Sequence, residues 1–158
     1  MRTELIDLTK YTASSNRIEL DDYSSGSYAV YCAANDDEKT FFLYETDRLR
    51  GPEPRCDYLL VCHADHTVRF IELKGIDHSY SCKEGCMSTW AHAFHQLIAT
   101  YEAYDYLIDY EDKVGMVLCT SVARGRIAAR YKNYKYYKRM QNRGIAPKVL
   151  CAEEEDAV

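Results

Sequence analysis

The sequence lacks several features that mark large classes of proteins. No stretch of about 20 apolar residues occurs in it, so a membrane-spanning helix is not expected. The N-terminal MRTELIDLTK is charged throughout and has no apolar signal core, which argues against secretion by that route. Internal repeats and low-complexity tracts are also missing. These absences favour a soluble, cytoplasmic protein that does not associate with a membrane.

Paired cysteine spacing of the kind found in secreted domains is missing as well. The chain has seven cysteines, an odd number at irregular intervals. A chain of 158 residues is long enough to build an apolar core without disulfides. We therefore expect reduced thiols in a cytoplasm, and one domain that spans residues 1–158.

One stretch, residues 56–75, organises the rest of the chain. It reads CDYLLVCHADHTVRFIELKG, with two strand-like runs at 57–62 and 67–74 and a short polar loop between them. This pattern predicts a β-hairpin. Side chains alternate along a strand, so Glu72 and Lys74 share one face. Antiparallel pairing is expected to bring Asp57 opposite the end of the second strand.

Two acids and a lysine at one end of an apolar hairpin have definite chemical consequences. A buried charge is costly unless it is paired or binds a metal. Two carboxylates a few ångströms apart repel, and one becomes protonated unless a cation lies between them. Mg²⁺ prefers oxygen ligands and often takes one or two carboxylates together with substrate phosphate. A nearby lysine can orient a water molecule or neutralise charge that develops on phosphate.

Asp57 followed by Glu72-Leu73-Lys74 resembles the PD-(D/E)XK nuclease superfamily, which has the restriction-endonuclease-like fold. The resemblance covers residues 40–120, and Cys56 stands where the family commonly has proline. It implies that Asp57 and Glu72 bind Mg²⁺ or Mn²⁺. It also implies that the carbonyl of Leu73 adds a metal ligand and that Lys74 assists the attacking water.

The family core implies an α/β fold with a mixed central sheet of about four to six strands flanked by helices. The sequence predicts strands at 28–33 and 40–45, which join the hairpin in an antiparallel sheet. It also predicts a helix over 88–108 with Ser88 as N-cap, and a buried strand over 113–120 that runs parallel to a hairpin strand.

The predicted helix and the strand over 40–45 contain further candidate site residues. Several branches of the family carry a glutamine on this helix, which implies that Gln96 is a catalytic residue. Tyr101 follows it by five residues, where the exonuclease branch has four, so a core position is the alternative for Tyr101. Glu45 is either a third metal-side acid or a solvated strand end.

Cysteines and histidines near the start of the predicted helix are candidate ligands for a zinc ion. Cys82, Cys86, His92 and His95 have ligand types that suit tetrahedral zinc, although their spacing is not a usual zinc pattern. Free thiols, with both histidines on the helix flank, are the alternative.

A basic segment, residues 121–143, carries eight positive charges and no acid, although the whole chain has a net charge of −5. Its tyrosines are interleaved with these charges, a composition that favours nucleic-acid binding. We predict a helix over 125–142 that ends at Gly144, followed by an edge strand over 147–151 and a solvated acidic tail over 152–158. The predicted nucleic-acid contacts are Arg124, Arg126, Arg130, Lys135 and Lys138. A solvated helix that pairs with acids elsewhere is the alternative.

The sequence as a whole predicts a metal-dependent nuclease that hydrolyses phosphodiester bonds, with DNA favoured over RNA as substrate. A homodimer or a partner subunit remains compatible with it. The alternative is a non-catalytic module on a nuclease-like fold that binds nucleic acid or protein.

Overall fold

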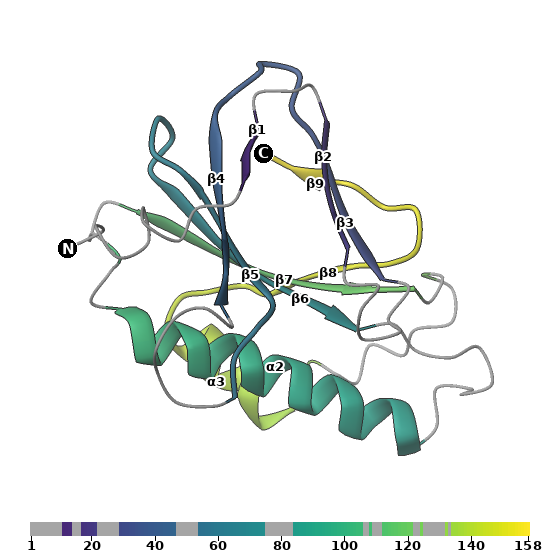
Figure 1. The fold of residues 1–158 in the computed structure, drawn as a ribbon. Coiled ribbons are helices and arrows are strands. Elements are labelled where there is room, and N and C mark those ends of the chain that lie inside the picture. Colours follow the sequence, from purple (N-terminus) through teal and green to yellow (C-terminus); the bar gives the residue numbers. More distant parts are fainter. Residues whose placement is uncertain are drawn as a thin grey trace.

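The protein has a three-layer α/β architecture in which helices cover one face of a large sheet and a small sheet covers the other (Figure 1). The structure, a computed structural model, describes residues 11–13, 17–21, 29–46, 54–74, 84–105, 108, 112–121, 124, 132 and 134–158. Within these ranges, no helix combines the length and the apolar character that crossing a membrane requires.

The large sheet is mixed and has the strand order β1-β4-β5-β6-β7-β8. The neighbouring pairs β1–β4, β4–β5 and β5–β6 are antiparallel, whereas β7 is parallel to β6 and β8 is parallel to β7. The parallel step follows a helical crossover, as such a connection requires. The strands are β1 Tyr11–Ala13, β4 Phe41–Glu45, β5 Tyr58–Cys62, β6 Thr67–Lys74, β7 Lys113–Thr120 and β8 Lys148–Leu150.

Helices α2 (Glu84–Tyr104) and α3 (Lys135–Asn142) pack on one face of this sheet (Figure 1). The apolar side of α2 recurs at three- and four-residue intervals and is buried against alternate residues of β5 and β6. Tyr137 and Met140 of α3 complete this helix-side core. The core members on α2 are Trp90, Ala93, Phe94, Leu97, Ile98 and Tyr104.

A small sheet with the order β2-β3-β9 packs on the opposite face of the large sheet (Figure 1). Its strands are β2 Arg17–Asp21, β3 Val30–Ala34 and β9 Asp156–Ala157. The second core lies between the two sheets and contains Tyr31 of β3 and Ile71 of β6. Because strand side chains alternate, β6 gives Phe70 to the helix side and Ile71 to the small sheet.

Several sequence predictions are confirmed. The α/β class and the mixed central sheet are observed, and β6 and β7 occupy the predicted ranges. Strand β7 joins β6 in parallel, as expected for an apolar strand after a helix. Strand β8 lies at the edge of the sheet. Gly144, with a φ of 76°, ends α3, because its amide donates to the carbonyl of Gln141 in a left-handed turn.

Other predictions are wrong. The strand predicted at 28–33 is β3, which belongs to the small sheet rather than to the hairpin sheet. Helix α2 begins at Glu84 and ends at Tyr104, so Ser88 is inside the helix and is not its N-cap. The helix predicted over 125–142 is not continuous, because Tyr134 takes an extended conformation with φ −67° and ψ 142° and α3 begins at Lys135. Residues 125–131 and 133 of that prediction lie outside the described residues.

The C-terminal segment also differs from the predicted solvated tail. Strand β9 pairs in parallel with β3, and Asp156 is only 4% exposed. The acidic side chain is buried because basic and hydroxyl partners from three strands surround it.

Candidate functional site

The register of the β5–β6 hairpin brings Asp57 opposite Glu72. Tyr58 pairs with Ile71, so the next pair of facing residues in the antiparallel ladder is 57 and 72. The amide of Asp57 donates to the carbonyl of Ile71 at 3.1 Å. In return, Asp57 Oδ2 accepts a hydrogen bond from the amide of Leu73 at 2.8 Å. These two bonds fix the Asp57 carboxylate beside the end of β6.

Glu72 differs from Asp57 in that its buried carboxylate accepts no hydrogen bond from any described residue. The residue is 1% exposed, and neither of its carboxylate oxygens accepts a hydrogen bond from a described residue. The Lys74 ammonium lies 3.5 Å from Oε2 as an ion-pair partner and is itself partly exposed. Burial, and then the neighbouring Asp57 carboxyl, raises the pKa of Glu72 to about 10, against a smaller opposing effect of Lys74.

These residues fit a divalent metal of the kind that the resemblance implies. Glu72 lies beside a second carboxylate, and neither of its oxygens accepts a hydrogen bond from a described residue, so a hard cation that prefers oxygen ligands would stabilise the pair in addition to Lys74. Within the described ranges, no group of three or more His, Cys, Asp or Glu residues could hold a metal. Protein donors at this position would therefore be Asp57 and Glu72, with backbone or water oxygens for the remaining ligands.

Helix α2 supports the site through residues spaced four apart. Thr100 Oγ1 accepts a hydrogen bond from the amide of Cys56 at 2.8 Å and donates to the carbonyl of Gln96 at 2.6 Å. Gln96 Nε2 donates to the carbonyl of Arg55 at 3.1 Å. The helix thus holds the two residues that precede Asp57. Gln96 Oε1 is buried and accepts no hydrogen bond from a described residue.

Gln96 therefore lies beside the predicted site. Tyr101 instead packs against the helix-side core, and Glu45 lies on the other face of the large sheet. The Tyr101 ring packs edge-on against Phe70 of the helix-side core, with centroids 5.9 Å apart. Strand alternation puts Glu45 on the side of Leu43, which belongs to the core between the sheets. Glu72 faces the opposite side, so a third metal-side acid from β4 is not supported.

Sequence reasoning missed Thr100 as a supporting residue. A buried threonine one helical turn after Gln96 was the available signal, since residues four apart share a helix face. The spacing alone does not reveal that its partner is the backbone of Cys56, which is 44 positions away.

Two of the four possible zinc ligands cannot be placed from the described residues. Cys82 lies outside them, and so does the side chain of Cys86. His92 and His95 lie on α2 with ring centroids 6.4 Å apart. The described cysteines are all free thiols: Cys32, Cys56, Cys62, Cys119 and Cys151.

The basic segment is less available for a ligand than its composition predicts. Arg124 binds both carboxylate oxygens of Glu154, at 2.7 and 2.6 Å, and donates to the carbonyl of Val149. Arg126 and Arg130 lie outside the described residues. Lys135 and Lys138 are exposed on α3 and form no ion pair with a described residue.

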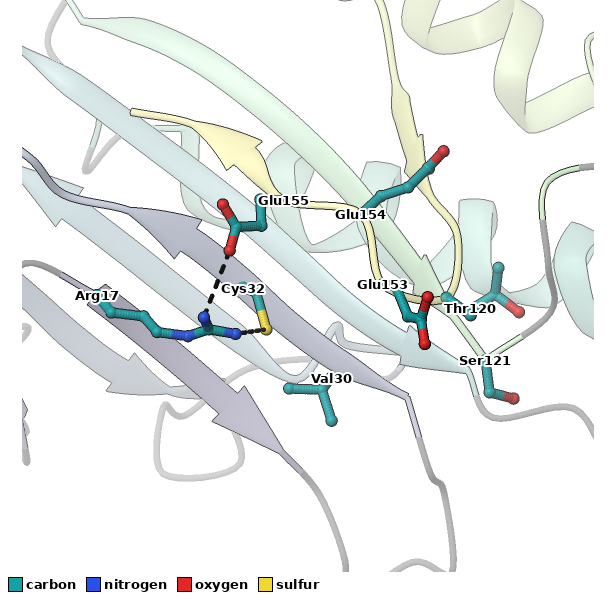
Figure 2. A pocket seen from close by; sticks show the side chains of 9 residues that line it. Arg17, Val30, Cys32, Thr120, Ser121, Glu153, Glu154 and Glu155 are labelled. Atoms are coloured by element: carbon teal, nitrogen blue, oxygen red, sulfur yellow. Dashed lines mark hydrogen bonds and ion pairs between the residues drawn. The ribbon is translucent and has the colours of Figure 1, made fainter.

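A cavity of about 280 Å³ lies elsewhere, where the small sheet meets residues 152–155 and the end of β7 (Figure 2). Arg17 crosses it, with Nη1 3.5 Å from Glu155 and Nη2 donating to Cys32 Sγ at 3.6 Å. Glu154 of the same wall is held by Arg124. The cavity contains none of the residues predicted to be catalytic.

Comparisons with protein-family models, curated proteins and solved structures give no match to this chain.

Proposed function

We propose that the protein is a metal-dependent nuclease that hydrolyses phosphodiester bonds, with its active site at Asp57, Glu72 and Lys74. The observation that carries this proposal is the buried Glu72 carboxylate. Its two oxygens lack hydrogen-bond donors from the described residues, and a second carboxylate and a lysine are its neighbours. A structural carboxylate has no need for such a setting, because burial without donors is destabilising.

Each residue would have a distinct role in the reaction. Asp57 and Glu72 would hold Mg²⁺ or Mn²⁺, with the Leu73 carbonyl as a further ligand. The ion supplies charge neutralisation and lowers the pKa of water when it is bound. Lys74, 3.5 Å from Glu72 and partly exposed, would orient the attacking water or neutralise charge on the phosphate. Gln96 Oε1 would accept a hydrogen bond from that water.

The order of the elements around the site supports the same proposal. Three antiparallel strands, β4, β5 and β6, are followed by α2 and then by β7 parallel to β6. This order agrees with the strand–helix–strand part of the restriction-endonuclease-like core. Helix α2 covers the face of β6 that carries Glu72 and Lys74 (Figure 1).

A non-catalytic binding module is the second candidate function, and one observation favours it. Burial and the Asp57 carboxyl raise the pKa of Glu72 and so favour its neutral form, which can persist in the fold without a metal. An idle site of this kind would leave the fold available for binding nucleic acid or another protein.

Cleavage of plasmid DNA and of single-stranded DNA and RNA with Mn²⁺ tests the proposal. We expect cleavage by the wild type, and a loss of at least about 100-fold in Glu72→Gln and Lys74→Met. Glu72→Gln keeps the shape of the side chain but removes the metal ligand. Asp65→Asn is the matched control, since it changes an acid at the opposite end of the same hairpin, where Asp65 pairs with Lys39.

The two candidate functions give opposite results. Cleavage that survives Glu72→Gln would overturn the proposed active site. Intact substrates, together with retained nucleic-acid binding by the wild type, would favour the binding module. Loss of folding in a variant is recognised by circular dichroism, and such a variant is then replaced by Asp57→Asn.

A further inference from the structure

Aromatic and cationic side chains form a row that leads away from the candidate active site along the helices. It begins at Lys74, at the end of β6, and passes through His92 and His95 of α2 to Tyr136 and Lys135 of α3. We call these five residues the helix-face row. Figure 1 shows β6 ending beside the N-terminal half of α2, with α3 packed next to that helix.

Ring contacts define the middle of the row. The His92 and His95 rings have centroids 6.4 Å apart at an angle of 73°. The His95 ring is stacked on the Tyr136 ring at 4.2 Å and 11°, so this pair joins α2 to α3. The ammonium of Lys135 lies 5.2 Å from the centroid of the Tyr136 ring. Both stacked rings are only half-buried.

The Lys74 end of the row is placed beside it by helix geometry. His92 is an exposed residue of α2 whose pKa is lowered by partial desolvation and then by the positive charge of the nearby Lys74 and by His95. His92 precedes Gln96 by four residues, so it lies on the same face of α2 as the residue that contacts the segment before Asp57. The row therefore starts next to the candidate catalytic residues.

We infer that the helix-face row binds a single strand of nucleic acid and feeds it into the site proposed above. This inference rests on the proposed function. Unpaired bases expose π faces that stack on aromatic rings, whereas the bases of a duplex are already stacked on each other. Cationic side chains at both ends of the row match the spaced phosphates of the same strand. The row itself contains no acid.

The nearby acids do not oppose this assignment. Glu102 of α2 is occupied by Arg139 at 2.6 Å and by Arg143 at 2.7 Å. The acids next to Lys74 belong to the site, where the scissile phosphate would approach. Among the described residues, the row thus presents aromatic and positive groups to the strand, and the acids beside Lys74 are those of the metal position.

Binding to a fluorescent oligothymidylate of about 12 nucleotides, measured in EDTA so that metal-dependent cleavage is blocked, tests the inference. We expect Tyr136→Leu to raise the Kd about tenfold or more, because leucine keeps apolar packing but removes stacking. Tyr136→Phe keeps the ring and is expected to stay within about twofold of the wild type. Lys113→Met, at an exposed position at the start of β7, is the control for loss of a positive charge outside the row, and we expect its Kd to stay close to that of the wild type.

Competition experiments separate the classes of nucleic acid. Unlabelled single-stranded DNA or RNA is expected to compete, and a duplex of the same length is expected to compete at least about tenfold less well. Stronger binding to the duplex, equal binding by Tyr136→Leu and Tyr136→Phe, or no binding by the folded wild type would overturn the inference. The binding assay measures no cleavage, so a failed nuclease assay would not decide whether the row binds a single strand. Likewise, a failure to bind the strand would not overturn the proposed metal site.

Discussion

Two buried carboxylates in this protein have opposite environments. Asp156, on β9, is 4% exposed and is surrounded by donors: the Tyr31 hydroxyl at 2.7 Å, the Lys148 ammonium at 2.5 Å, the Arg69 guanidinium at 3.4 Å and the amide of Ala157 at 3.0 Å. Glu72, on β6, is 1% exposed and accepts no hydrogen bond from a described residue.

The comparison separates a structural carboxylate from a candidate functional one. Donors from different strands satisfy Asp156, so its side chain ties β9 to β3 of the small sheet and to β6 and β8 of the large sheet. Its charge, after burial, raises the pKa of the Tyr31 hydroxyl and keeps that group protonated as a donor. Glu72 instead lies in an environment that disfavours its charge, with Lys74 as its ion-pair partner and no hydrogen bond accepted from a described residue.

The largest effect is expected when Asp156 is removed. Asp156→Ala leaves Arg69, Lys148 and the Tyr31 hydroxyl without their shared acceptor. We expect the free energy of unfolding to fall by about 3–5 kcal/mol. Urea denaturation measures this change, with Asp36→Ala in an exposed turn as the control. A loss below about 1 kcal/mol would show that the ionic cluster is not structural.

Substitution of Glu72 is expected to stabilise the metal-free protein, whereas substitution of Asp156 destabilises it. The pKa of Glu72 is raised in the fold, so its favourable contribution is present below about pH 4.5 and is lost as the pH rises toward 10. Relative to the wild type, Glu72→Gln should therefore gain stability between about pH 5 and pH 9, by on the order of 2 kcal/mol.

Urea denaturation of the two proteins in EDTA across this pH range checks the sign. Parallel stability curves for the wild type and Glu72→Gln would mean that Glu72 titrates normally. That outcome would remove the contrast with Asp156.

A smaller effect is expected at Tyr31, which donates to Asp156. Tyr31→Phe keeps the buried ring and removes one of several donors. We expect a loss of about 1–2 kcal/mol, measured by thermal unfolding. No change would indicate that Lys148 and Arg69 suffice for the Asp156 carboxylate.

The smallest effect is expected at a third carboxylate, Glu102, whose side chain is 22% exposed. It binds Arg139 and Arg143, and these arginines are 49% and 41% exposed. Glu102→Gln should cost less than about 1 kcal/mol, and less still at high salt, because solvent screens exposed pairs. A loss comparable to that of Asp156→Ala would mean that donors alone, without burial, determine the effect.

Sequence patterns predicted the Glu72 region better than the Asp156 region. The hairpin follows from apolar runs around a short polar loop, and its antiparallel pairing brings residues 57 and 72 together. Strand β7 follows from a continuous apolar run. These signals are local or involve neighbouring strands, so the arrangement of the candidate site was accessible from the sequence.

The small sheet could not be predicted from local sequence patterns in the same way. Strand β9 has only two residues, and its acidic surroundings are typical of a solvated tail. Its burial depends on Tyr31, 125 positions away, and on Arg69 of another sheet. The extended Tyr134 that precedes α3 makes another long-range contact, since its ring packs against Phe94 of α2 with centroids 6.3 Å apart. Long-range packing of this kind has no periodic signal in the sequence.

Calorimetry of Mn²⁺ binding, repeated at pH 7 in buffers of different ionisation enthalpy, tests whether Glu72 is a metal ligand. Glu72 has to lose its proton when it becomes a metal ligand, so the wild type should release about one proton per bound ion. Glu72→Gln should bind far more weakly and release none. Absence of Mn²⁺ binding by the folded wild type, or binding without proton release, would contradict a metal site at Glu72.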